Sequence, residues 1–259
     1  MQNRLELEYD GSRFSGWTRQ PGRRTVQEEV ERALAVLLRE PAVTVTVAGR
    51  TDAGVHALRQ LASYSGAPAS PRAMNALLPD DVAVLSCEEA PAGFDARRDA
   101  TSRAYCYRIL SRPARPALDR GRALHWPYRL DLEWLDQCAA ALVGTHDFTA
   151  FTPTNSEHVH FARCVLAAFW RAGSPTEVQF WIEADAFMRH MNRVLVGTML
   201  EVSSGRRSVA DFRSLLEGAP RAQAGPTAPP HGLYLAGVGY RGRRVLPEPW
   251  KVAQLQLGL

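Results

Sequence analysis

The order of two periodicities along the chain limits it to few folds. Residues 43–47 alternate apolar and polar side chains with the period of two that is typical of a half-buried strand. Upstream, apolar residues from Val26 to Leu37 recur at the spacing of a helix face. Together with the patterns that follow to about residue 90, these periodicities predict a β-α-β-β-α-β order of the ferredoxin-like type. The predicted elements are strand 5–9, helix 25–37, strands 43–47 and 60–65, helix 71–78 and strand 82–87.

The rest of the chain repeats the order of helix, hairpin, helix and strand, after two extended segments at 94–98 and 103–110. Residue identity between the halves is negligible, so an internal duplication is a hypothesis about architecture. We predict an α+β fold of two ferredoxin-like halves, residues 1–105 and 106–245, followed by a tail at 246–259. The predicted elements of the second half are helix 131–142, strands 164–170 and 178–184, helices from 187 to 202 and from 208, and strand 233–240.

Two helix starts carry capping signals. Glu28 follows Thr25 at the spacing of a capping box, and Asp131 stands before the first helix of the second half. We expect the side chains of Thr25 and Asp131 to cap these helices.

Composition narrows the protein class. No apolar run approaches the ~18 residues of a membrane span, and the N-terminus leads directly into a strand, so we expect a soluble protein without a signal peptide. The four cysteines form no CxxC pair, which argues against a zinc site or a disulfide framework and fits a reducing cytoplasm. Only Lys251 among the 31 basic residues is a lysine. Arginine suits nucleic-acid recognition, but a GC-rich genome would give the same bias.

The nine residues from Gly49 to Ala57 place a carboxylate beside a guanidinium directly after the alternating strand. If the extended geometry continues, Arg50 and Asp52 share the face opposite the buried valines. Gly49 and Gly54 allow sharp turns on either side. A neighbouring arginine keeps a carboxylate ionised, as a nucleophile or general base requires. For an arbitrary Arg-Thr-Asp tripeptide, a polar surface loop is the alternative interpretation.

A loop rich in arginine follows the first strand and contains Phe14 and Trp17. Such a mixture can grip a phosphate backbone while the rings stack on bases. The alternative is a loop that its aromatic residues pin to the core. The arginines of this basic loop are Arg13, Arg19, Arg23 and Arg24.

The strand at 103–110 presents Arg103, Tyr105 and Tyr107 on one face. In an enzyme that acts on nucleic acid, a phenol there can stack under an unpaired base or act as a weak acid. Both tyrosines can equally cover the core, which is the interpretation that we prefer for Tyr107.

On the helix that starts near residue 187, Arg189 and Arg193 are four residues apart and Gly197 continues their row. A glycine one turn from a guanidinium lets another backbone come close. Arg193 adjoins the apolar stripe, and a partly buried arginine needs an anion, for which Asp52 is a candidate. A solvated helix face is the alternative.

Several motifs in order make the chain resemble the tRNA pseudouridine synthase A family along most of its length. The segment from Gly49 to Ala57 is the most specific of them. Thr18, Asn192 and the run 203–205 depart from the usual pattern of the family, and none of these departures touches the proposed catalytic residues. The other matching motifs are 8–11 with Phe14 and 16–17, 25–27, 94–97, 103–107, 146–148, 187–197 and 232–235.

The resemblance implies that Asp52, in the N-terminal half, is the essential catalytic residue. It also implies that Arg50 helps to open out the target nucleotide, that Tyr105 lies against the uracil, and that Arg193 pairs with the catalytic carboxylate. The implied fold joins the two halves into one extended mixed or antiparallel sheet, with helices on one face and the active-site cleft between the halves. We assign contacts with RNA to Arg13, Arg19, Arg23, Arg24, Arg97 and Arg189.

The implied activity is isomerisation of uridine to pseudouridine in the anticodon stem-loop of tRNA, at positions 38, 39 and 40. The resemblance further implies a homodimer and no cofactor or metal. Asp52 would act either by attack at C1′ of the ribose or by removing a proton from C2′, and the sequence does not separate these routes. Two rival hypotheses are a noncatalytic RNA-binding protein of ferredoxin-like fold and a retaining glycosidase or nucleosidase. The first leaves Arg50, Asp52 and Arg193 unexplained, and the second lacks a clear second carboxylate.

Overall fold

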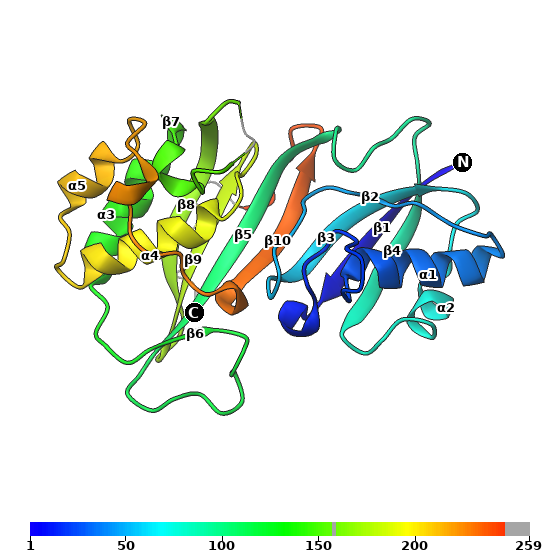
Figure 1. Cartoon of the computed structure of the whole chain (residues 1–259), viewed down its shortest axis with the longest axis horizontal. Helices are drawn as coiled ribbons and strands as arrows, with labels where there is room; N and C mark the ends of the chain where they lie inside the picture. The colour runs from blue at the N-terminus through cyan, green and yellow to red at the C-terminus, as the bar shows by residue number, and fades with distance from the viewer. Residues whose placement is uncertain (157–158, 247–259) are drawn as a thin grey trace. The chain divides into compact units, whose positions relative to one another are not determined.

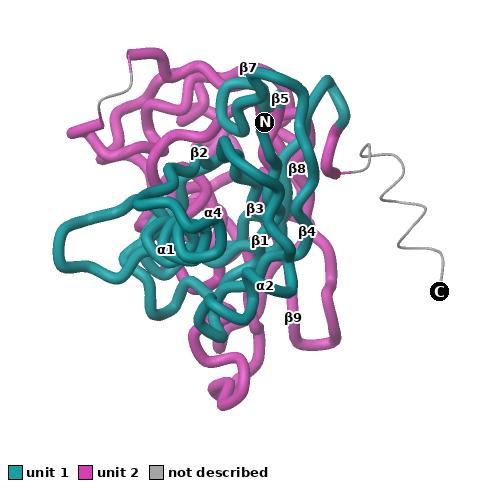
Figure 2. Tube along the Cα trace, turned by 90° about the vertical axis from the view of Figure 1, so that its right-hand side faces the viewer, with its two compact units in different colours: residues 1–101, 234–243 teal, residues 102–233, 244–259 magenta. Residues whose placement is uncertain are grey.

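The computed structural model describes residues 1–156 and 159–246 and has the predicted α+β fold (Figure 1). The chain forms two compact units (Figure 2). Unit 1 contains residues 1–101 and 234–243, and unit 2 contains residues 102–233 with the segment from 244 on. The predicted tail at 246–259 lies, from residue 247 on, outside the described residues. No helix in the described part of the chain is long and apolar enough to cross a membrane.

Unit 1 has strands in the order β4-β1-β3-β10, and β2 pairs with β3 as well. β1 is antiparallel to β3 and β4, and β10 is parallel to β3. The elements of the first half follow the predicted β-α-β-β-α-β order, and α1 and α2 pack against each other. The elements are β1 (Gln2–Tyr9), α1 (Val26–Leu38), β2 (Thr46–Val47), β3 (His56–Ser65), α2 (Pro71–Asn75), β4 (Val82–Ala90) and β10 (Leu233–Tyr240).

The alternating run 43–47 is half-buried as predicted but is only partly a strand. Val43, Val45 and Val47 are buried, whereas only Thr46 and Val47 pair with β3. The backbone N–H of Val45 donates instead to Glu31 Oε1 of α1, at 3.1 Å. A side chain from a helix has therefore replaced a strand partner.

The start of α1 differs from the predicted capping box. Thr25 is the N-cap residue, but its side chain makes no capping hydrogen bond. The backbone N–H groups of Val26 and Gln27 donate to the carbonyls of Gly16 and Trp17, at 3.3 and 3.0 Å. The basic loop thus takes the place of a side-chain cap at this helix end. At α3, by contrast, Asp131 accepts from the N–H of Trp134 as predicted.

Unit 2 has strands in the order β5-β9-β8-β7, with every neighbouring pair antiparallel, and β6 runs parallel to β5. Its helices α3, α4 and α5 pack against one another, and α3 also contacts β8. The elements are β5 (Ala100–Ser111), β6 (Leu124–Trp126), α3 (Leu132–Leu142), β7 (Gly144–Asp147), β8 (Ala162–Ser174), β9 (Glu177–Ala184), α4 (Met191–Ser203) and α5 (Val209–Ser214).

Candidate active site

The segment 48–55 joins β2 to β3, and its side chains differ in burial. Thr51 is only 7% exposed, whereas Arg50 before it is exposed and Asp52 after it is half-buried. Gly54 has a φ of +78°, and the N–H of Val55 donates to the Asp52 carbonyl at 3.1 Å, which closes a turn. The two polar residues are therefore presented on either side of one buried threonine.

A buried polar network holds that threonine. The Tyr9 hydroxyl and Thr51 Oγ1 are 2.8 Å apart. Gln60 Nε2 donates both to the Tyr9 hydroxyl, at 3.2 Å, and to the Gly49 carbonyl, at 2.7 Å. Burial raises the pKa of Tyr9 to about 12, so its hydroxyl stays protonated at neutral pH. Both residues that flank Arg50 are thus attached to the sheet.

The roles of Tyr9 and Gln60 in this network were not predicted from the sequence. The Gln60 side chain is wholly buried, and most of the residues that follow it in β3 are buried as well. A buried amide must find hydrogen-bond partners, which is the signal that would have identified the network.

The basic loop is interlocked with this segment. The N–H of Trp17 donates to the Thr51 carbonyl at 3.0 Å, and the N–H of Gly54 donates to the Phe14 carbonyl at 3.3 Å. Gly16 has a φ of +94°, and a Cβ there would lie 2.8 Å from the Thr51 carbonyl oxygen. The aromatic residues of the loop, Phe14 and Trp17, are buried. The basic loop and the segment 48–55 therefore form one structure.

The arginines of the basic loop differ in their contacts. Arg24 makes two hydrogen bonds to Asp81, at 2.7 and 2.8 Å, and lies over the Phe14 ring. This bonding raises the pKa of Arg24 and lowers that of Asp81. Arg19 pairs with the buried Glu31 at 3.0 Å. The other two, Arg13 and Arg23, are exposed, and Arg13 also lies 3.4 Å from Asp81.

The predicted RNA contact Arg97 comes from a turn that packs on the sheet of unit 1. Asp95 Oδ1 accepts from the N–H groups of Arg97 and Arg98, both at 2.8 Å. Ala96 is fully buried, in a cluster with Ala48, Leu61 and neighbouring apolar residues. Arg97 is thus exposed on a turn that packs, through Ala96, against Ala48, the residue directly before Gly49.

In unit 2 the two tyrosines of β5 are both largely buried. Tyr105 is 8% exposed and meets Phe187 edge to face, with ring centroids 5.0 Å apart. Tyr107 is 1% exposed and donates to the Pro229 carbonyl at 2.8 Å. Burial also raises the pKa of Tyr107. Tyr107 is therefore a core residue, which is the interpretation that we preferred from the sequence.

α4 begins at Met191, four residues later than predicted. His190 before it has a φ of +61°, so the helix cannot continue upstream in regular geometry. Arg189, which we expected on the helix beside Arg193, is exposed in the preceding turn. Arg189 therefore does not belong to the helix row that we predicted for it with Arg193 and Gly197.

Arg193 is fixed at its backbone and its side chain by one residue. Its Nε donates to the Ala228 carbonyl at 2.8 Å, and the Ala228 N–H donates to the Arg193 carbonyl at 3.0 Å. A Cβ on Gly197 would lie 1.8 Å from the Pro226 carbonyl oxygen. The prediction that Gly197 admits another backbone close to Arg193 is thus confirmed.

Comparison with known proteins gives consistent matches. A family described as tRNA pseudouridine synthase matches residues 138–241. A protein of Bacillus subtilis (strain 168) is 39% identical, over 93% of this chain and 99% of its own length. One of Methylococcus capsulatus (strain Bath) is 43% identical over 93% and 90%, and one of Chromobacterium violaceum is 38% identical over 99% and 100%. All three bear the name tRNA pseudouridine synthase A.

Proposed function

The chain belongs to the tRNA pseudouridine synthase A family, and from this premise we propose that it modifies uridines in the anticodon stem-loop of tRNA, with Asp52 as the catalytic carboxylate. As a tRNA pseudouridine synthase it is an isomerase. The proposed targets are positions 38, 39 and 40. We also propose that the protein is cytoplasmic and forms a homodimer.

One observation carries the assignment of Asp52. It is a half-buried carboxylate that directly follows a threonine anchored to the sheet, in the segment that most resembles the family. The hydrogen bonds of Tyr9, Gln60 and Trp17 fix the backbone at residues 49 and 51. A catalytic group needs such support because its reacting atom must be held within a fraction of an ångström.

The reaction breaks the C1′–N1 bond, turns the freed uracil and joins C1′ to C5, whose proton is released while N1 gains one. A single carboxylate suffices, either as a nucleophile at C1′ or as a base at C2′. The target base must leave its stack, at a cost of a few kcal/mol that is smaller in a loop. Water must be excluded, because hydrolysis would leave an abasic site.

We propose roles for four further groups of residues. Arg50, which is exposed in the segment 48–55, helps to open out the nucleotide. Tyr105 supplies a ring surface for the uracil, and Arg193 pairs with the catalytic carboxylate. Among the arginines proposed to bind RNA, Arg24 is the least available, because Asp81 and Phe14 engage its guanidinium. The other proposed RNA-binding arginines are Arg13, Arg19, Arg23, Arg97 and Arg189.

Mapping of modified positions tests the proposed target. An unmodified tRNA transcript with uridines at 38, 39 and 40 is incubated with the purified protein, and pseudouridine is located by carbodiimide labelling and primer extension. We expect modification at these positions and none in the T-loop. A matched transcript with cytidines at 38–40 should release no C5 proton, whereas undiminished release from it would contradict the proposed target.

The two substitutions Tyr105→Phe and Tyr105→Leu separate stacking from chemistry. We expect Tyr105→Phe to retain most of the activity, because the ring that faces Phe187 is kept. Loss of the ring in Tyr105→Leu should lower kcat/KM by about tenfold or more, since base–aromatic stacking is worth about 1–3 kcal/mol. The measurement is tritium release from C5-labelled uridine in tRNA. Equal and severe losses in both variants would show that the hydroxyl takes part in the reaction.

A further inference from the structure

A segment of backbone lies along α4 and ends at Arg193. Residues 223–228, called the strap below, are joined to the helix at three levels, two of them directly and one through Arg207. At the C-terminal end of the strap, called its lower end, two hydrogen bonds join Ala228 and Arg193. In the middle, the Gly225 N–H donates to Thr198 Oγ1 at 3.0 Å, and that hydroxyl donates to the Val194 carbonyl at 2.7 Å.

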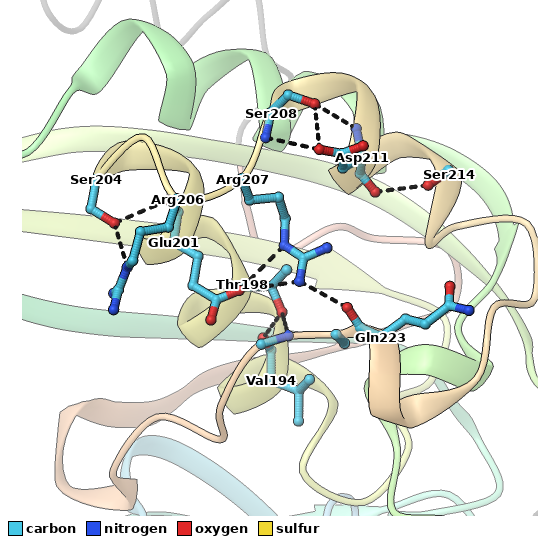
Figure 3. Close-up of polar contacts among 12 residues, drawn as sticks. Val194, Thr198, Glu201, Ser204, Arg206, Arg207, Ser208, Asp211, Ser214 and Gln223 are labelled. Atoms are coloured by element: carbon cyan, nitrogen blue, oxygen red, sulfur yellow. Dashed lines mark hydrogen bonds and ion pairs between the residues drawn. The ribbon is translucent and has the colours of Figure 1, made fainter.

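The upper end of the strap is held by Arg207, which follows α4 in the chain (Figure 3). Its Nη2 donates to the Gln223 carbonyl at 2.8 Å. Its Nε and Nη2 also bond to Glu201 Oε2, at 3.3 and 3.2 Å. The guanidinium therefore joins the strap to a carboxylate on the helix.

The fit between strap and helix leaves little room for adjustment. A Cβ on Gly225 would lie 2.8 Å from Thr198 Cα and 2.9 Å from Glu201 Oε2, and one on Gly197 would lie still closer to Pro226. Closely packed backbones transmit a displacement rather than absorb it. A shift at Gln223 is thus expected to reach the Ala228 carbonyl.

We propose that Arg207 is a positioning residue, which sets the orientation of the Arg193 guanidinium through the strap and the Ala228 carbonyl. The proposal rests on the catalytic role proposed above for Arg193. In this scheme Arg207 touches neither substrate nor reacting atoms, and its removal disturbs the geometry at Arg193.

The neighbouring Arg206 provides a matched control. Its Nε donates to Ser204 Oγ at 3.0 Å, as Figure 3 shows. Ser204 Oγ in turn donates to the Glu201 carbonyl. Removal of Arg206 therefore deletes an equal charge at the same helix end while the Arg207–Gln223 hydrogen bond remains.

The test compares kcat and KM for tRNA in Arg207→Ala, Arg207→Lys, Arg206→Ala and Thr198→Val, alongside their thermal midpoints. We expect kcat of Arg207→Ala to fall about tenfold with KM within about twofold, because misplacement of a catalytic group lowers turnover more than binding. Arg207→Lys should recover part of the loss. Arg206→Ala should match the wild type. Thr198→Val, which removes the acceptor of Gly225, should reproduce the loss even if Arg207→Ala fails to fold.

A double-mutant cycle shows whether the effect passes through Arg193. In an Arg193→Lys background, Arg207→Ala should lower kcat by less than about twofold, because the group that it positions is already altered. Equal kcat in Arg207→Ala and Arg206→Ala, or independent effects that multiply in the cycle, would overturn the proposal. Wild-type turnover by Arg193→Ala would instead refute the role of Arg193, which is a distinguishable outcome.

Discussion

Replacement of Asp52 by asparagine is expected to abolish pseudouridine formation and leave tRNA binding unchanged. The amide has nearly the same shape, so the hydrogen bonds of Thr51 to Tyr9 and Trp17 remain. A neutral amide neither attacks C1′ nor removes the proton at C2′, and we expect turnover to fall at least about a thousandfold. Tritium release from C5-labelled uridine measures turnover, and filter retention of labelled tRNA measures binding.

The matched control is Asp80→Asn, the same chemical change at an exposed carboxylate of unit 1. Its turnover should equal that of the wild type. Asp52→Ala serves as a second variant, because it excludes slow deamidation back to aspartate as a source of residual activity. If Asp52→Ala formed product at a substantial rate, another group would have to carry out the chemistry.

Gly197→Ala is expected to destabilise the protein, against the usual effect of this change in a helix. In a helix interior, alanine is ordinarily more stable than glycine by about 1 kcal/mol. At Gly197 the added Cβ would lie 1.8 Å from the Pro226 carbonyl oxygen, so the strap must move off α4. We expect the free energy of unfolding to fall by about 2 kcal/mol or more, as it does when other cores are overpacked, and the thermal midpoint to fall with it. Turnover should fall as well, because the displaced strap carries the Ala228 carbonyl that orients Arg193.

The control for this change is Gly242→Asn. Gly242 is exposed, has a φ of +72°, and has no atom within 4 Å of the site of a Cβ. Asparagine tolerates this backbone conformation, so the thermal midpoint should change little. A Gly197→Ala protein that is as stable as the wild type would contradict the close approach of strap and helix.

Local periodicity predicted most of the elements, and it was wrong where a distant group supplies a hydrogen bond. The burial of Val43, Val45 and Val47 follows from alternation, but the short length of β2 depends on Glu31 from α1. Similarly, the capping box at Thr25 was a sound local prediction. In the structure the carbonyls of Gly16 and Trp17 accept from the first two N–H groups of the helix, and the Thr25 side chain makes no capping hydrogen bond.

The candidate site shows the same division. The residue pattern identified Asp52 and Arg50 as candidates, and Gly197 as a point where backbones meet. It gave no indication that residues 223–228, between the predicted helix from 208 and the predicted strand 233–240, lie on α4. Arg207 and Thr198 make hydrogen bonds in that contact. Nothing in the sequence pattern around these two residues indicates which backbone groups they bind.

The interlocking of the basic loop with the segment 48–55 has a consequence for the order of folding. The carbonyl of Thr51 and the N–H of Gly54 obtain their partners from residues 14 and 17, and the Thr51 hydroxyl obtains its partner from β1. Each of these bonds requires β1, or the loop that directly follows it, to lie beside the segment 48–55. The segment 48–55 therefore belongs to the same cooperative unit as the sheet of unit 1, and its local opening should require subglobal unfolding rather than hinge motion.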